Sequence, residues 1–293
     1  MSVPSLLVVQ NAHSDPIGRL GDWLSAAGLT LDVRNLEGGD ELPGHPDDYD
    51  GLLVLGGEMG VADDEHFPWL PAVRSLLRDA VAREVPTLGV CLGAQLLALA
   101  NGGAVGPNPD GPEFGAQLVA KRGVASTDPL FGPLPITPDV VQWHFDAVTS
   151  LPPGAVQLFS SPGCELQAFR LGRLAWGVQF HIETTPDVIR AWAVADADAL
   201  VGYDVELMLR RIDEVDADLV EVWQPFAATF AAVVQDPDRV KAGRALGIPT
   251  SVAAPITDPA QIRAALAAEL SASRGPQVLP MPGLGQPGIG RDG

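Results

Sequence analysis

The chain has 293 residues, of which 46% are hydrophobic and 19% charged, a composition typical of globular proteins rather than of disordered chains. Its 18 lysines and arginines stand against 37 aspartates and glutamates, so the net charge is −19, and a nucleic-acid backbone or an anionic lipid surface would repel it. We therefore expect neither nucleic acid nor a membrane as a partner.

The N-terminal apolar run and the two cysteines bear on where the protein works. The run at residues 6–9 has no basic segment before it and is too short for a signal sequence or a membrane span. Cys91 and Cys164 give neither a disulfide framework nor a four-ligand zinc pattern, although one bridge between the two stays open. We expect a cytoplasmic protein that needs no metal or organic cofactor.

Apolar runs of strand length alternate with helical spacing through the first hundred residues. Strands are predicted at residues 5–10, 29–33, 51–55 and 85–90, and helices at 69–83, at 92–100 and from 17 to a stop at Gly28. Short runs at 117–120, 155–159, 165–169 and 174–180 lack intervening helices and are predicted to add strands at one edge. The pattern predicts an α/β fold with an open, twisted, mostly parallel sheet flanked by helices.

The chain changes character near residue 190. Residues 1–190 form the predicted α/β domain, and two or three helices are predicted in the alanine-, valine- and leucine-rich extension at 191–238. Packing on the sheet suits this extension best, while a homodimer contact or a docking site for another protein stays open. Residues 239–293 are rich in proline and glycine and are predicted to form a largely disordered tail, with at most a short helix at 260–271.

The segment Gly89-Val90-Cys91-Leu92-Gly93-Ala94-Gln95 predicts a nucleophile elbow, a strand that passes directly into a helix through one strained residue. Small neighbours at Gly89 and Gly93 permit such a turn, and a helix N-terminus favours a thiolate. An isolated cysteine in an apolar run is more often inert and buried. The two glycines and the following helix instead favour a nucleophilic role for Cys91, and nothing comparable surrounds Cys164.

Two further strand ends carry candidate chemistry. His181 and Glu183 end the run that begins at Trp176, and residues two apart on an extended chain point the same way, so the carboxylate can orient the imidazole as the base of a triad. Gly56-Gly57 ends another apolar run, where N–H groups can face a developing oxyanion; Gly57 and Leu92 are the predicted donors. Taken alone, the first pattern suits a surface pair and the second a simple turn.

Together these residues resemble the class I (triad) glutamine amidotransferases, whose fold is flavodoxin-like. The similarity covers about residues 5–190, and it is closest to stand-alone domains similar to the amidotransferase part of GMP synthase. The motifs that carry it, besides the elbow, are Leu55-Gly56-Gly57-Glu58-Met59-Gly60, Phe67-Pro68-Trp69-Leu70 and Gln142-Trp143-His144-Phe145-Asp146.

The resemblance implies an activity and a set of binding residues. Cys91 would attack the side-chain amide of glutamine, His181 would transfer the proton, ammonia would leave, and water would hydrolyse the γ-glutamyl thioester to glutamate. The implied substrate-binding residues are Gly56, Gln95, Trp143, His144 and Phe145. For the side chain of His144, a hydrogen-bonded loop pair with Asp146 is an equal alternative.

The sequence also departs from the family pattern. Ile182 stands where the family usually has proline between the His and the Glu, so the spacing is kept without the fixed φ of proline. No phosphate-binding loop or synthetase domain follows, so the amidotransferase interpretation requires either an ammonia-accepting synthetase partner or a solitary role as a γ-glutamyl amide or peptide hydrolase. A cysteine esterase or lactonase and a non-catalytic binding module on the same fold are the remaining alternatives.

Overall fold

The computed structural model describes residues 3–242. Within them, the main sheet has eight strands in the order β2-β1-β3-β4-β12-β11-β10-β7. The five strands that pair in parallel are β2 (Thr30–Asn35), β1 (Ser5–Gln10), β3 (Gly51–Val54), β4 (Thr87–Val90) and β12 (Ala175–Val178). Antiparallel strands complete the edge: β11 (Ala168–Leu171), β10 (Val156–Ser160) and β7 (Ala120–Lys121).

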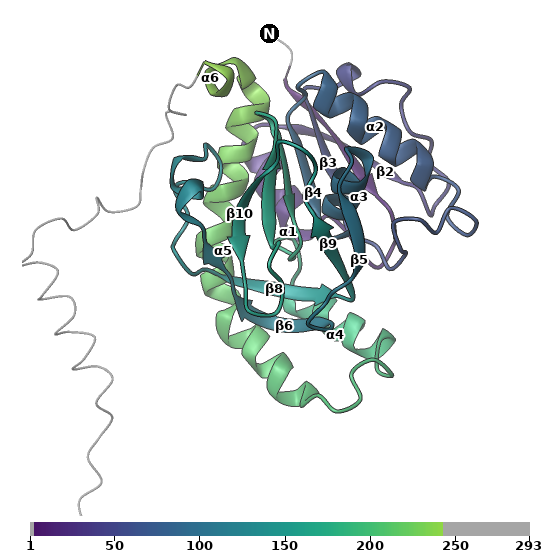
Figure 1. Cartoon of the computed structure of the whole chain (residues 1–293), viewed down its shortest axis with the longest axis vertical. Helices are drawn as coiled ribbons and strands as arrows, with labels where there is room; N and C mark the ends of the chain where they lie inside the picture. Colours follow the sequence, from purple (N-terminus) through teal and green to yellow (C-terminus); the bar gives the residue numbers. More distant parts are fainter. Residues whose placement is uncertain (1–2, 243–293) are drawn as a thin grey trace, which may run out of the picture. The chain divides into compact units, whose positions relative to one another are not determined.

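Helices cover both faces of this sheet (Figure 1). Helices α1 (Gly18–Ala26) and α5 (Val205–Gln235) pack on one face, against alternate strand residues such as Leu6, Val8 and Leu53. The other face, which presents Leu7, Val9 and Leu52, packs against helices α2 (Leu70–Ala82) and α3 (Leu92–Ala100). Because the central strands are buried on both faces, they read as continuous apolar runs, and the predicted fold class is confirmed.

Two short antiparallel pairs lie outside the main sheet: β5 (Ala104–Pro107) with β9 (Asp146–Ser150), and β6 (Glu113–Leu118) with β8 (Asp139–His144). The sequence patterns did not reveal this arrangement, since the predicted strand at 117–120 covers parts of β6 and β7. Turns η1 (Pro46–Asp48) and η2 (Gly123–Thr127) are short 3₁₀ helices. Strand β8 carries Gln142, Trp143 and His144 of the 142–146 motif, and the carbonyl oxygen of Trp143 lies 3.9 Å from the sulfur of Cys91 at the end of β4.

The extension after residue 190 contains the second half of α4 (Pro186–Ala195), all of α5 and the short α6 (Pro237–Lys241). Trp223 of α5 is fully buried, and its indole N–H donates to Asp139 O at 3.0 Å. Helix α5 therefore shares one hydrophobic core with the sheet. The proposed boundary at 190 stays a prediction, and the predicted tail beyond 242, with its helix at 260–271, lies outside the described residues.

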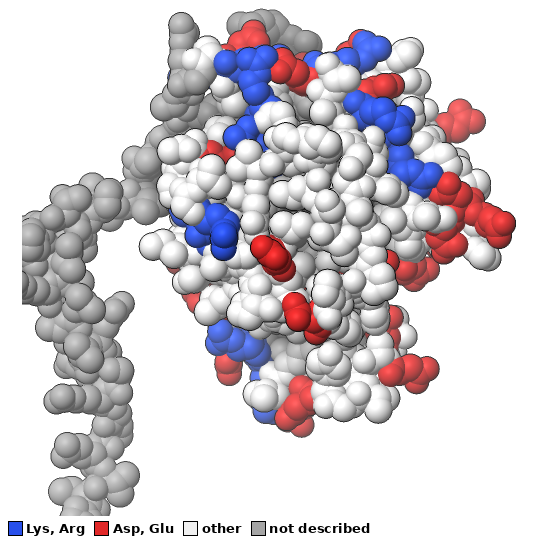
Figure 2. All heavy atoms as spheres, viewed as in Figure 1, with Lys and Arg blue, Asp and Glu red and all other residues white. Residues whose placement is uncertain are grey.

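The surface charges and the apolar character of the helices in residues 3–242 can be compared with the expectations from composition. On the face shown in Figure 2, many of the basic side chains lie beside acidic ones rather than forming one basic patch. Among residues 3–242, no helix combines the length and the apolar character that a membrane crossing requires.

The passage from β4 into α3 depends on two glycines. A Cβ at Gly93 would lie 2.0 Å from Val54 O on the neighbouring strand, and a Cβ at Gly89 would lie 2.6 Å from the carbonyl group of Gly93. Real Cβ atoms do not approach backbone so closely, so only glycine lets α3 begin this near the sheet.

Replacing Gly93 with alanine should therefore displace α3 from β3 and lower the free energy of unfolding by about 1–3 kcal/mol or more, the usual cost of overpacking. Urea unfolding monitored by circular dichroism measures the change. Gly106→Ala is the matched control, because no atom lies within 4 Å of a Cβ placed there. Equal stability of the two variants would contradict the packing constraint.

Candidate active site

A cavity of about 180 Å³ lies where four neighbouring parallel strands end. Residues that follow β1, β3, β4 and β12 all contribute to its lining, the position at which α/β sheets usually bind ligands. The cavity collects most of the residues predicted from sequence: Gly57, Cys91, Gln95, Trp143, His144, Phe145 and His181. Gly56, Leu92 and Glu183 are not among the residues that line it.

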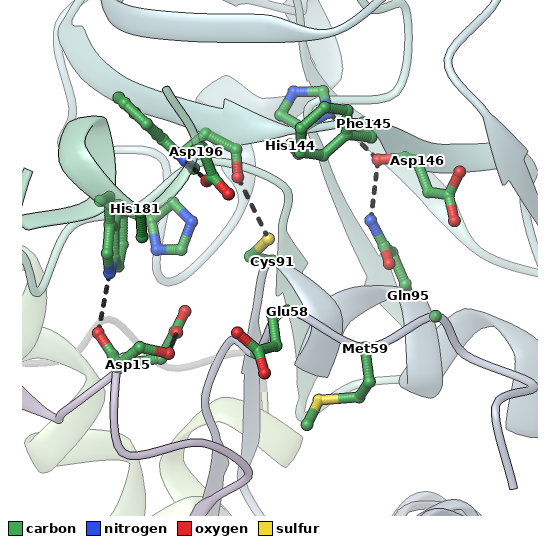
Figure 3. A pocket seen from close by; sticks show the side chains of 16 residues that line it. Asp15, Glu58, Met59, Cys91, Gln95, His144, Phe145, Asp146, His181 and Asp196 are labelled. Atoms are coloured by element: carbon green, nitrogen blue, oxygen red, sulfur yellow. Dashed lines mark hydrogen bonds between the residues drawn. The ribbon is translucent and has the colours of Figure 1, made fainter. Parts of the chain in front are cut away.

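Cys91 occupies the strained turn that the elbow motif predicts. Its φ is +49° and its ψ −109°, a conformation that residues other than glycine rarely adopt. The backbone is held there by the Cys91 N–H, which donates to Val178 O at 2.8 Å, and by the start of α3 at Leu92. The thiol donates to Trp143 O at 3.9 Å and accepts from Gln179 Nε2 at 3.7 Å, so it points into the cavity (Figure 3).

His181 and Glu183 form a buried pair, each with a side chain 1% exposed. Strand β12 ends at Val178, earlier than the predicted 180, and His181 is held instead by a β-bridge to Val141. Its Nδ1 lies 2.6 Å from Glu183 Oε1. The other carboxylate oxygen accepts from the Ile182 N–H at 2.8 Å, a bond that proline could not make because it has no N–H.

The surroundings of His181 favour its protonated form. Burial, the largest single influence, lowers the pKa, but the negative charges of Glu183 and of a Cys91 thiolate outweigh it and hold the pKa of His181 well above the ordinary 6.5. An imidazolium between a carboxylate and a thiolate can stabilise the nucleophile and later give its proton to a leaving amine.

The Gly-Gly turn after β3 is held by a residue that sequence reasoning missed. Asn11, which directly follows β1, donates from Nδ2 to Leu55 O at 2.9 Å and to Gly56 O at 3.4 Å. Within the described residues, the N–H groups of Gly57 and Leu92 donate to no other group. Both amides are therefore available as oxyanion donors.

Gln95 lies on the other side of Cys91 from His181 (Figure 3). Its Nε2 donates to Asp146 O at 2.8 Å and to Gln179 Oε1 at 3.2 Å. Gln179, a second residue that sequence reasoning missed, thereby links Gln95 to the thiol of Cys91. Both glutamines are buried, so their orientation is fixed before any ligand arrives.

Each residue of the motif on and after β8 meets the cavity in a different way. Trp143 offers its carbonyl to the thiol, and its indole N–H donates to Asp196 Oδ2 at 2.7 Å. His144 turns away into a buried cluster, where Nε2 lies 3.0 Å from Glu113 Oε2 and Nδ1 lies 3.1 Å from Asp146 O. This agrees with the loop-pair alternative for its side chain. Phe145, 49% exposed, stands at the cavity.

The chain is similar to known proteins in both sequence and structure. Residues 22–193 match the profile of the family described as glutamine amidotransferase class-I. The chain belongs to this family. It is 27% identical to the glutamine amidotransferase-like protein YfeJ of Salmonella typhimurium, over 67% of this chain and 82% of the relative. It is 34% identical to a glutamine-hydrolysing GMP synthase component of Thermoplasma acidophilum, over 47% of this chain and 64% of the relative.

Solved structures agree with the family assignment. A glutamine amidotransferase from Thermotoga maritima superposes with a TM-score of 0.71 at 27% identity, covering 80% of this chain and all of that one. Catalysis by a cysteine is general among class I amidotransferases. The elbow at Cys91 is where this chain offers one.

A second cluster of potential ligand atoms lies at the β6–β8 pair, which carries Glu113 and His144. Glu113, His144 and Cys164 bring one ligand atom each within 4.8 Å of one another. Burial, with the charge of Glu113 adding to it, raises the pKa of Cys164 to about 12, and both ring nitrogens of His144 already have partners. The donor set therefore suits a hydrogen-bonded support rather than a metal site. Both Cys91 and Cys164 are free thiols, so the bridge left open by the sequence is not formed.

The raised pKa of His181 gives a pH-dependent prediction. Because folding raises this pKa, protonation of the ring stabilises the fold fully below pH 6.5, and that stabilisation is lost as the pH rises through the raised value. In Glu183→Gln the carboxylate charge is absent while burial remains, so the pKa of His181 should fall by one or more units (roughly, from the usual size of ion-pair effects).

Histidine ring signals followed by NMR during a pH titration measure this shift. Asp187→Asn is the matched control, since Asp187 is an exposed acid near the start of α4 that pairs with Arg190 rather than with His181. An unchanged His181 titration in Glu183→Gln would show that the carboxylate does not tune the ring, and a wild-type pKa at or below 6.5 would contradict the raised pKa.

Proposed function

We propose that this protein is a cysteine-dependent glutaminase of the amidotransferase type, with Cys91 as nucleophile, His181 as acid–base group and Glu183 as its orienting carboxylate. The observation that carries the proposal is the convergence of a strained cysteine and a buried His–Glu pair on one cavity. An esterase elbow usually takes its acid from a separate loop, whereas here the acid lies two residues from the His.

The proposed reaction has two halves. The Cys91 thiolate attacks the amide carbon of the γ-glutamyl group, the C–N bond breaks, and His181 gives its proton to the departing nitrogen, leaving a γ-glutamyl thioester. Water then attacks the thioester and His181 accepts a proton from it, so the C–S bond breaks, glutamate leaves, and the Cys91 thiolate and the His181 imidazolium are regenerated. In both halves the oxygen of the tetrahedral intermediate would accept hydrogen bonds from the Gly57 and Leu92 amides.

The substrate-binding roles follow from position. Gln95, fixed by Asp146 O and Gln179, would bind the amino-acid end of the substrate, with backbone groups of Trp143, His144 and Phe145 beside it. Gly56 contributes by the absence of a side chain, since a Cβ there would lie 2.7 Å from Asp15 Oδ1 and 3.2 Å from His181 Cε1.

The proposal also covers what happens to the ammonia that the reaction releases. The GMP synthase component of Thermoplasma acidophilum carries a name that couples glutamine hydrolysis to a synthetase, and a synthetase partner for this chain is inferred by analogy. Hydrolysis of other γ-glutamyl amides without ammonia transfer is the second candidate. A homodimer, a cytoplasmic location and independence from cofactors stay predictions.

The deciding experiment measures glutamate release from glutamine and from γ-glutamyl amides by the purified chain. Wild-type protein should release glutamate, and Cys91→Ala should lower the rate by about 10⁴-fold or more, because removing a nucleophile leaves only binding and oxyanion stabilisation. Cys164→Ser is the matched control and should keep full activity. Equal activity of wild type and Cys91→Ala would refute the nucleophile.

A further inference from the structure

Four carboxylates line the cavity without a lysine or arginine as partner. Asp15, Glu58, Asp146 and Asp196 line it, whereas its lining includes no lysine or arginine. Among residues 3–242, none of these four acids forms a salt bridge, although many acids elsewhere do, such as Asp64 with Arg74 at 2.7 Å. Apart from histidine rings, the cavity therefore offers these carboxylates no cationic side chain.

Asp15 is the most buried of the four acids that line the cavity. It is only 8% exposed, its Oδ2 accepts from the Ser14 hydroxyl at 2.7 Å, and its Oδ1 has no hydrogen-bond partner in the described part of the chain. Burial is the main reason why the pKa of Asp15 is raised, and the positive charge of His181 counteracts it. A buried carboxylate in this state is stabilised by a cation that enters beside it.

Asp15 lies on the His181 side of the cavity. The point where a Cβ on Gly56 would stand is 2.7 Å from Asp15 Oδ1 and 3.2 Å from His181 Cε1, so both groups flank the same space. The ring of Trp192 packs edge-on against His181 with centroids 4.8 Å apart, and Asp196 lies one helical turn further along the chain. Figure 3 shows Asp15, His181 and Asp196 on one side of Cys91, with Gln95, Phe145 and Asp146 on the other.

The proposed chemistry assigns these two sides to two parts of a substrate. His181 must protonate the departing nitrogen, so the amine leaves on the side of Asp15, Trp192 and Asp196. The γ-glutamyl group then occupies the side of Gln95. Glutamine has no group beyond its amide nitrogen, so it would leave the carboxylates at the amine end unused.

We propose that the preferred substrates are γ-glutamyl amides whose amine portion carries a further positive charge, such as an alkyl ammonium, bound by Asp15 and Asp196 beside the ring of Trp192. This inference rests on the proposed function and narrows its substrate class. The reaction is the same hydrolysis: the C–N bond breaks, water supplies the hydroxyl group of glutamate, and the amine leaves with the proton from His181. Carboxylates and an aromatic ring are the groups that bind ammonium ions.

Binding to Cys91→Ala tests the charge preference without turnover. The two probes are γ-glutamyl-n-butylamide and γ-glutamyl-1,4-diaminobutane, which have similar length and differ by one terminal ammonium. Calorimetry should show about tenfold or more tighter binding of the cationic probe, within the range of a partly desolvated ion pair with an aromatic contact. The preference should shrink in 1 M salt, where the Debye length is only about 3 Å.

Charge-removing variants assign the preference to residues. Asp15→Asn and Asp196→Asn, each combined with Cys91→Ala, should weaken binding of the cationic probe several-fold more than binding of the neutral one. Asp198→Asn, an exposed acid outside the cavity, should leave the ratio unchanged. Because Asp196 is only partly buried, its variant remains informative if Asp15→Asn fails to fold.

Hydrolysis rates of the wild-type protein distinguish a failure of the charge preference from a failure of the proposed function. Wild-type hydrolysis of both probes at equal kcat/KM, with equal binding, would overturn the charge preference and leave the cysteine hydrolase intact. Selective binding of the cationic probe without hydrolysis of any γ-glutamyl amide would instead contradict the proposed function. Equal binding in Cys91→Ala overturns the inference whatever the turnover.

Discussion

The strained backbone of Cys91 is the constraint on which the rest of the site depends. A positive φ at a residue with a side chain is unfavourable, and the chain maintains it through the Val178 carbonyl on one neighbouring strand and the close approach of α3 to the other at Gly93. The turn places the sulfur beyond the strand end, at the N-terminus of a helix. Every other group of the site is arranged around that fixed position.

The groups around Cys91 reach it from neighbouring parallel strands. Asn11 after β1 holds the turn after β3, and Gln179 and His181 follow β12. Strand β8 closes the cavity from outside the main sheet, because the Val141–His181 bridge ties it to the catalytic segment. Glu183 is held by both the ring and the Ile182 amide, so the carboxylate keeps its place without the proline usual in the family.

Sequence patterns predicted the fold and the candidate triad because both rest on local signals. Buried parallel strands give continuous apolar runs, and the elbow needs glycines at fixed offsets from Cys91. Asn11, Asp15 and Gln179 follow strand ends without a local motif, and their roles arise only when separate strands meet. Likewise, β5, β6, β8 and β9 pair outside the main sheet, and the local pattern does not specify their partners.

The most direct test of the account is labelling with the glutamine-mimicking electrophile 6-diazo-5-oxo-L-norleucine, followed by mass spectrometry of the cysteine peptides. We predict one adduct, on Cys91, formed faster in wild type than in His181→Asn. Cys164 should stay unmodified, because burial keeps it a thiol with a pKa of about 12. Labelling of Cys164 in preference to Cys91, or equal labelling with and without His181, would contradict the account.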